Sequence, residues 1–217
     1  GIGIGLLAKG PIIVILTLPP IFVWALFTNN IKKAWAQLPW ISGVLLLVAV
    51  SLPWYISAEL RTPGFIDYFI VGEHFERYFN SEWRGDKYGF PKQQPLGMVW
   101  VFLIVFLLPW TLALIHLMVR KWKSLIQDPW LLFLLLWSAW TPLFFTSSKS
   151  LIHPYILPSC IPVALLISHY WATIKNKKLY AGTAIGLPLL LFFVHLSGMA
   201  KPWYSHTTDK FLISPLD

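Results

Sequence analysis

Charged residues are scarce in this chain of 217 residues, where Asp, Glu, Lys and Arg together make up 12% of the sequence. Soluble globular domains contain about 25% charged residues, so this chain has too little polar surface to enclose a water-soluble core. Hydrophobic residues account for 57% of the sequence, and Trp occurs 13 times. Trp is enriched where a membrane meets water. The composition therefore predicts a membrane protein and argues against a soluble one.

The scarcity of cysteine and the absence of a basic domain restrict the functions expected of the chain. Cys160 is the only cysteine, so no disulfide can form within the chain and redox chemistry is not expected. The net charge is +8, but the basic residues lie between apolar runs rather than in a basic domain, so we expect no nucleic-acid partner. An initiator Met and the basic start of a signal peptide are also missing. The chain begins instead with alternating Gly and Ile, which predicts a fragment truncated at its beginning.

Several apolar stretches are long enough to cross a bilayer, which takes about 20 mostly apolar residues. The expected spans cover roughly residues 11–28, 38–57, 95–119, 129–146, 151–173 and 179–197. The apolar runs are continuous and lack the alternation that a membrane β-barrel needs. We therefore predict an all-α polytopic membrane protein with about six transmembrane helices, forming a single transmembrane domain over 1–217.

The connections between these stretches predict the orientation. Short basic connections stay in the cytoplasm, and on one side of the membrane the connections carry Lys32, Lys33, Arg120, Lys121, Lys123, Lys175, Lys177 and Lys178. The longer loop over about 58–94 has balanced charge, with five basic and six acidic residues. It is therefore expected outside the cytoplasm, together with the tail 198–217. Lys9 and Lys149 fall on the same outer side.

Within the outer loop, the run 68–79 is amphipathic enough for a short helix on the membrane surface. His74 and Arg77 are three residues apart and would share one face of it. His74 and Glu73 are candidate ligands of a divalent metal, but a metal site needs at least three ligands. His206 in the tail is on the same side and could be a third. The spacing alone favours an ordinary interfacial helix over a metal site.

Two further outer positions carry a lysine at a turn. Lys149 lies in the serine-rich turn 146–150, before an apolar helix. It could bind a phosphate, assisted by serine hydroxyls and helix N–H groups, or simply extend into the headgroup region. Lys9 precedes Gly10 and Pro11 at the start of another helix, where the helix dipole disfavours a cation unless an anion lies between. That position favours anion binding.

Four motifs occur in a recognisable order, and together they cover nearly the whole chain. They are Leu7-Ala8-Lys9-Gly10-Pro11, Leu52-Pro53-Trp54-Tyr55, the run 69–79 through Glu73-His74 to Arg77-Tyr78-Phe79, and Ser148-Lys149-Ser150 followed by Pro154-Tyr155-Ile156-Leu157-Pro158. The series resembles the bacterial protein mannosyltransferase-like enzymes of glycosyltransferase family 39, and most closely the aminoarabinose transferases that modify lipid A.

This resemblance implies a C-type glycosyltransferase fold. Such enzymes move a sugar from a polyprenyl-phosphate carrier to an acceptor outside the cytoplasm, which would be lipid A, another glycan or a protein. It also implies that Lys9, Arg77, Lys149 and Tyr155 bind the substrate or its phosphate. His74 becomes a metal ligand or a phosphate contact by the same comparison.

The chain departs from the family in one respect. The acidic catalytic pair of the family lies in the first extracytoplasmic loop, near the start of the whole enzyme, and this chain has no such segment. A catalytic base is therefore expected upstream of Gly1, and the fragment alone is expected to be inactive. The role is not transferred to Asp67, Glu73 or Glu76.

Two alternatives remain open. A transporter or flippase for a lipid-linked sugar would carry polar residues near the middle of the membrane. The predicted helix interiors contain few of them, chiefly Ser138, Thr141 and His195. A non-catalytic membrane subunit is the other alternative.

Overall fold

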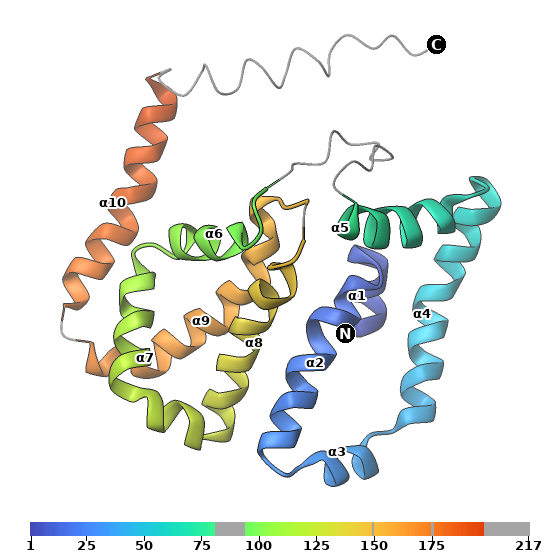
Figure 1. The fold of residues 1–217 in the computed structure, drawn as a ribbon, viewed down its shortest axis with the longest axis horizontal. Coiled ribbons are helices and arrows are strands. Elements are labelled where there is room, and N and C mark those ends of the chain that lie inside the picture. The colour runs from blue at the N-terminus through green and yellow to red at the C-terminus, as the bar shows by residue number, and fades with distance from the viewer. Residues whose placement is uncertain (81–93, 149, 175, 198–217) are drawn as a thin grey trace.

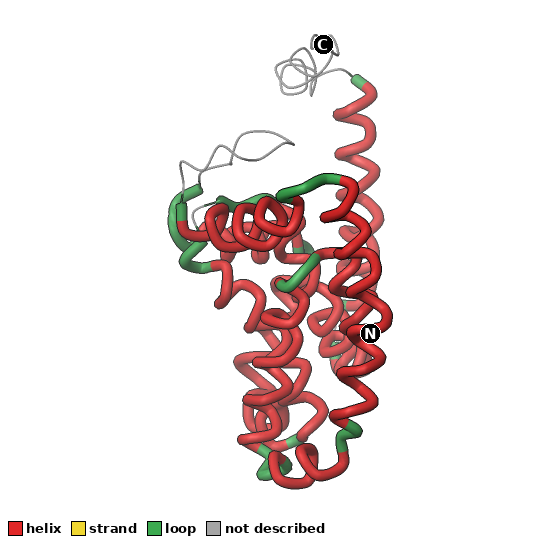
Figure 2. Tube along the Cα trace, turned by 90° about the vertical axis from the view of Figure 1, so that its right-hand side faces the viewer, coloured by secondary structure: helices red, strands yellow, loops and turns green. Residues whose placement is uncertain are grey.

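The structure, a computed structural model, describes residues 1–80, 94–148, 150–174 and 176–197, with the side chain of His195 excepted. Every element in these residues is a helix (Figure 2), which confirms the predicted all-α class. The elements are α1 (Ile2–Lys9), α2 (Ile12–Phe27), α3 (Ile31–Gln37), α4 (Trp40–Arg61), η1 (Asp67–Glu76), α5 (Arg77–Phe79), α6 (Met98–Phe106), α7 (Trp110–Gln127), α8 (Pro129–Phe145), η2 (His153–Ile156), α9 (Leu157–Tyr170), η3 (Trp171–Thr173) and α10 (Lys177–Leu196).

Three helical segments in the described residues are long and apolar enough to cross a membrane. They are α4, the continuous stretch His153–Thr173 that contains α9, and α10. These segments match the predicted spans 38–57, 151–173 and 179–197. The helices α2 and α8 match the predicted spans 11–28 and 129–146, but they are shorter, at 16 and 17 residues.

The predicted span over 95–119 is not one continuous helix. The chain forms two helices there, α6 and α7, which meet at a bend of 105°. Pro109 lies at the bend, immediately before α7. Proline has no N–H to donate and disfavours helical backbone in the residue before it, so α6 ends at Phe106. Across the bend, the Thr111 hydroxyl donates a hydrogen bond to the carbonyl of Ile104 over 2.6 Å.

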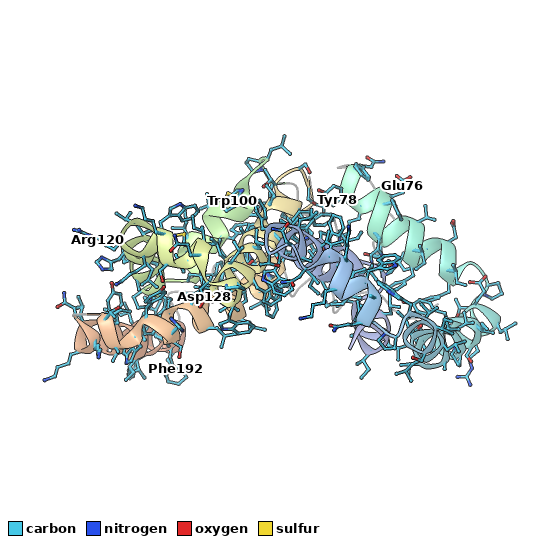
Figure 3. All side chains as sticks on the ribbon, turned by 90° about the horizontal axis from the view of Figure 1, so that it is seen from below. Glu76, Tyr78, Trp100, Arg120, Asp128 and Phe192 are labelled. Carbon is cyan, nitrogen blue, oxygen red and sulfur yellow. The ribbon has the colours of Figure 1, made fainter. Side chains whose placement is uncertain are left out.

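The best-packed part of the protein is the group α7, α8 and α9. Its core is formed by buried side chains that include Leu117, Leu131, Leu134, Val163 and Leu166. A second buried cluster, around Val99, Phe102, Phe145, Leu151 and Ile156, lies where α6, α8 and η2 meet. Seen from below, α10 with Phe192 lies at one edge of the molecule and η1 with Glu76 at the other (Figure 3). Two of the helices, α4 and α10, expose most of their apolar side chains.

The two ends of the molecule differ in chemistry. The basic residues of α3, of the end of α7 and of the start of α10 lie toward the lower end of Figure 1. At the opposite end, η1, α5 and α6 lie across the direction of the long helices (Figure 1). The predicted grouping of the basic connections is therefore present in the fold. Which compartment each end faces stays a prediction.

The outer loop begins later than predicted, because α4 continues to Arg61 rather than ending near residue 57. The carboxylate of Glu59 then accepts hydrogen bonds from the backbone N–H groups of Gly64 and Ile66, both over 2.8 Å. These bonds join the last turn of α4 to the start of η1. The predicted interfacial helix over 68–79 is present as η1 followed by α5. The remainder of the loop and the tail 198–217 lie outside the described residues.

Replacing Glu59 with Ala is expected to loosen the turn between α4 and η1, because the N–H groups of Gly64 and Ile66 lose their acceptor. Hydrogen–deuterium exchange of these two amides should accelerate on the order of tenfold. Glu59→Gln keeps one acceptor oxygen and should give an intermediate rate. Unchanged exchange in Glu59→Ala would show that the carboxylate does not hold this turn.

Candidate functional site

The first part of the candidate site is the contact between η1 and the junction of α1 with α2. The His74 ring has Nδ1 2.7 Å from the carbonyl oxygen of Phe69 and Nε2 3.1 Å from the carbonyl oxygen of Lys9. Gly10 follows Lys9 with a φ of +71°, and a Cβ there would lie 2.8 Å from the rings of His74 and Phe69. Only glycine accepts both this backbone conformation and this approach. Gly10 therefore allows the turn over residues 9–11, here called the Lys9 turn, to contact η1.

The second part is a chain of polar side chains along η1. The hydroxyl of Tyr68 donates to one carboxylate oxygen of Glu73 over 2.6 Å, and Arg77 donates to the other over 2.7 Å. The side chains of Glu73 and Arg77 are 14% and 18% exposed. The segment η1 is a π-helix, in which residues five apart pair along the axis. This explains why Tyr68 reaches Glu73 and why Phe69 reaches His74.

The atoms of the predicted metal ligands have other partners in this arrangement. Both ring nitrogens of His74 face backbone carbonyl oxygens, and both carboxylate oxygens of Glu73 already accept hydrogen bonds. Within the described parts of the chain, no group of three His, Cys, Asp or Glu side chains is placed to hold a metal ion. The prediction of a divalent metal stays untested, and His206 lies outside the described residues.

Tyr78 connects α5 to the turn that follows α8. Its hydroxyl donates to the carbonyl oxygen of Phe144 and lies 2.7 Å from the hydroxyl of Ser147. On the other side of this turn, the indole N–H of Trp100 donates to the hydroxyl of Thr146 over 2.9 Å. The turn is therefore held by both η1–α5 and α6. Lys149, two residues after Ser147, lies outside the described residues.

The serines around Lys149 are buried. Ser148 and Ser150 are 1% and 2% exposed. The Ser148 hydroxyl donates to the carbonyl oxygen of Ser150 over 3.1 Å, and the Ser150 hydroxyl has no hydrogen-bond partner among the described residues. The Ser150 hydroxyl is therefore the buried hydroxyl beside Lys149 that is available for the predicted contact with a phosphate.

Tyr155 is linked to this turn through stacked rings. It stacks on Phe145 at 4.7 Å between ring centroids and an angle of 24°. Phe145 contacts Phe144 at 4.9 Å, and Phe144 contacts Tyr78 at 5.0 Å. This row of rings runs from Tyr78, next to Arg77, to Tyr155. The row therefore joins α5, the helix that begins with Arg77, to the predicted substrate-binding residue Tyr155.

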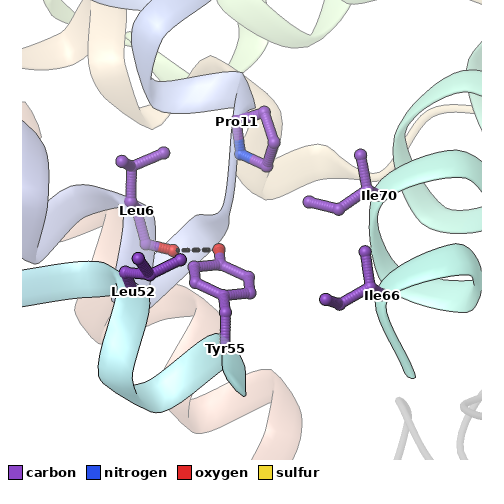
Figure 4. Close-up of a pocket in the computed structure, with 6 residues that line it drawn as sticks. All are labelled: Leu6, Pro11, Leu52, Tyr55, Ile66 and Ile70. Carbon is purple, nitrogen blue, oxygen red and sulfur yellow. Dashed lines mark hydrogen bonds between the residues drawn. The ribbon is translucent and has the colours of Figure 1, made fainter. Parts of the chain in front are cut away.

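An apolar pocket of about 270 Å³ lies beside the Lys9 turn (Figure 4). It is lined by Leu6, Pro11, Leu52, Tyr55, Ile66 and Ile70. The hydroxyl of Tyr55 donates to the carbonyl oxygen of Leu6 over 2.8 Å. This bond joins the motif around Tyr55 to the end of α1. Two of the other sequence motifs therefore meet the Lys9 turn, one through His74 and one through Tyr55.

Comparison with known proteins finds similar chains. The chain is 30% identical over 222 residues to undecaprenyl phosphate-alpha-4-amino-4-deoxy-L-arabinose arabinosyl transferase 2 of Pseudomonas fluorescens (strain Pf0-1), a match that covers 97% of this chain and 38% of that protein. It is 29% identical over 194 residues to the arabinosyl transferase of Erwinia tasmaniensis, covering 85% of this chain and 32% of that protein. The chain is a relative of these arabinosyl transferases.

The predicted resemblance to aminoarabinose transferases is therefore confirmed. The chain spans less than two fifths of the length of the arabinosyl transferases just named. No family model matches the chain, and no solved structure matches it.

The structure gives specific roles to three positions in the four sequence motifs. Gly10 allows the Lys9 turn to approach η1, Tyr55 holds α1, and Tyr78 holds the turn before Lys149. A glycine between Lys and Pro, and tyrosines at the ends of apolar runs, were the available signals. Trp100 carried no such signal, because a Trp near a helix end is common in membrane proteins.

Proposed function

We propose that this chain supplies the carrier-phosphate binding region of a membrane glycosyltransferase. The enzyme would move a sugar from a polyprenyl-phosphate carrier to an acceptor outside the cytoplasm. The observation that carries the proposal is the contact between His74 and the carbonyl of Lys9. It brings together two cation-bearing motifs that are 65 residues apart in the sequence. The names of the arabinosyl transferases, which specify an undecaprenyl phosphate sugar donor, support the same reading.

The chemistry is a displacement at the anomeric carbon of the sugar. The acceptor hydroxyl loses a proton to a base and forms a bond to this carbon, while the bond from the carbon to the carrier phosphate breaks. The leaving phosphate takes up negative charge, which preorganised cations stabilise. In this chain, Lys9, Arg77 and Lys149 would supply these cations. None of the acids in this chain is assigned the role of the base.

The arrangement of Arg77 suits a preorganised cation. Glu73 holds the guanidinium, and Tyr68 holds Glu73. Because the Glu73–Arg77 pair is largely buried, its geometry resists rearrangement better than that of an exposed ion pair. A phosphate that reaches this end of the molecule would meet a positioned Arg rather than a mobile one. Tyr155, at the far end of the aromatic row, would contact the same substrate.

The polar residues inside the helices give little support to the transporter alternative. Ser138 is 7% exposed and donates its hydroxyl hydrogen bond to the carbonyl of Leu135 within its own helix. Thr141 is fully buried where α8 packs. Neither residue lines an open path. We therefore place the activity at the outer end of a bacterial inner-membrane protein, with lipid A, another glycan or a protein as acceptor.

The test uses the full-length protein in membranes. Lys149→Ala and Lys9→Ala should each reduce sugar transfer from a labelled polyprenyl-phosphate donor by roughly 100-fold, the usual effect of removing one transition-state contact. Lys178→Ala, at the basic end, should transfer at nearly the wild-type rate. Wild-type kinetics in Lys149→Ala would refute the phosphate role. Movement of the labelled lipid across vesicles without transfer would favour the transporter instead.

A further inference from the structure

His153 is an exposed histidine close to Lys149, and the proposed transfer reaction gives it no part. It begins η2, four residues after Lys149 and three after Ser150. One short stretch of chain therefore carries a lysine, a buried serine and a histidine. The His153 side chain is exposed, and its ring nitrogens have no hydrogen-bond partner among the described residues. The nitrogens are therefore free to contact a ligand.

The ring of His153 is held against α6. Its centroid lies 4.6 Å from that of Phe102 and 5.5 Å from that of Phe106. The two phenylalanines are four residues apart, so they lie on one face of the helix. Phe102 is 7% exposed, whereas Phe106 is 56% exposed. The His153 ring therefore packs where the core meets the surface, and turning it away would break two ring contacts.

The same helix also contacts the chain on the other side of Lys149. The bend of 105° between α6 and α7 lays α6 across the direction of the long helices, at the end of the molecule where η1 and α5 lie (Figure 1). The indole N–H of Trp100 on α6 donates to the hydroxyl of Thr146 over 2.9 Å. Lys149 thus lies in the chain between two residues, Thr146 and His153, that α6 contacts.

The combination of side chains suits an anion that carries several oxygens. An imidazole has at least one N–H donor in either protonation state. The buried Ser150 hydroxyl, which has no partner among the described residues, can donate as well. Phosphate oxygens accept hydrogen bonds from such donors, and these bonds are stronger when the acceptor is charged. Because Phe102 and Phe106 already fix the ring of His153, little side-chain freedom is lost on binding.

A purely structural role for His153 would make a different demand on the side chain. The ring would then serve only to cover Phe102 and Phe106, with its polar edge in water, as amphipathic side chains do at a membrane surface. Phenylalanine would fill that role equally well, because it keeps a ring against α6 and loses only the nitrogens. The two roles therefore differ in their response to one substitution.

We propose that His153 binds the carrier phosphate beside Lys149, by donating a hydrogen bond from its ring to a phosphate oxygen. The proposal rests on the proposed function, in which Lys149 contacts the same phosphate. The phosphate is negative both in the bound donor and as the leaving group, so the contact is made in both states. Its loss should therefore raise the KM for the donor more than it lowers kcat.

Steady-state transfer by the full-length protein in membranes tests the proposal, with donor and acceptor varied separately. His153→Phe should raise the KM for the polyprenyl-phosphate donor about tenfold, the effect of losing one hydrogen bond to a charged group. His153→Gln restores an N–H donor without the ring and should give a KM between those of wild type and His153→Phe. His169→Phe is the matched control, because His169 is also exposed and its ring lies 4.8 Å from that of Tyr170, near the basic end. The control should have wild-type kinetics.

A wild-type KM for the donor in His153→Phe would overturn the proposal, as would a rise confined to the KM for the acceptor. Weaker donor binding in His153→Gln than in His153→Phe would also overturn it, because packing against α6 would then be what matters. If His153→Phe does not accumulate in membranes, His153→Leu takes its place. Lys149→Ala is measured in parallel. Loss of transfer in Lys149→Ala with wild-type kinetics in His153→Phe removes only the role of His153, whereas wild-type kinetics in both variants refutes the proposed function too.

Discussion

Replacing Gly10 with Ala in the full-length protein is expected to reduce sugar transfer by about 100-fold, the effect of misplacing a catalytic group by roughly 1 Å. The new methyl group would lie 2.8 Å from ring atoms of both His74 and Phe69. The backbone at Gly10 also has a φ of +71° and a ψ of −161°, a region populated essentially only by glycine, which costs a residue with a Cβ on the order of 1–3 kcal/mol. The Lys9 turn must then move away from η1, which displaces Lys9 from its position beside His74.

The measurement is the steady-state kinetics of transfer in membranes that contain equal amounts of protein. Gly43→Ala is the matched control, because Gly43 lies in α4 with no atom within 4 Å of the added Cβ. The control should transfer at the wild-type rate. If the loss in Gly10→Ala follows from misplacement, kcat should fall more than KM rises. Wild-type kinetics in Gly10→Ala would show that contact between the Lys9 turn and η1 is not needed for transfer.

Replacing Arg77 with Ala should have a similarly large effect, a loss of transfer between about 100-fold and 1,000-fold. The substitution removes a proposed phosphate contact and also leaves the largely buried carboxylate of Glu73 without its cation. Arg77→Lys keeps the charge but not the planar fork of donors, so an intermediate loss is expected. Glu73→Gln keeps the shape of the side chain and weakens its hold on Arg77, so it should lower transfer less than Arg77→Ala does.

A cycle of single and double substitutions separates the role of Arg77 itself from the role of Glu73 in positioning it. If Glu73 acts only by positioning Arg77, then Glu73→Gln should have little further effect once Arg77 is Ala. Arg61→Gln is the matched control, since Arg61 is an exposed Arg in the last turn of α4 that precedes η1. Equal losses in Arg61→Gln and Arg77→Ala would indicate a general effect of charge at this end. That result would contradict a specific role for Arg77.

Much of the architecture could be predicted because it depends on local composition. A membrane span needs a long apolar run, and this property is present in the sequence of α4, α9 and α10 before any folding. The grouping of Lys32, Lys123 and Lys177 toward one end follows from counting spans between them. The family motifs were likewise readable in order along the chain.

The bend between α6 and α7 could not be predicted from the sequence. A proline inside an apolar run is common in membrane helices, where neighbouring helices satisfy the freed backbone groups. Pro109 alone could therefore not distinguish a mild kink from a turn of 105°. The π-helical form of η1 had no local signal either. It is visible in the pairing of Tyr68 with Glu73 and of Phe69 with His74.

The sequence by itself determined the helical class, the main apolar spans and the set of candidate cations, because these follow from the transfer of side chains from water to lipid. Only the tertiary structure decided that Arg77 pairs with Glu73, that His74 meets the carbonyl of Lys9, and that Tyr78 holds the turn before Lys149. Contacts such as that between His74 and Lys9, 65 residues apart, depend on how whole helices pack. Helix packing responds to the shape of all facing side chains together, which no local pattern encodes.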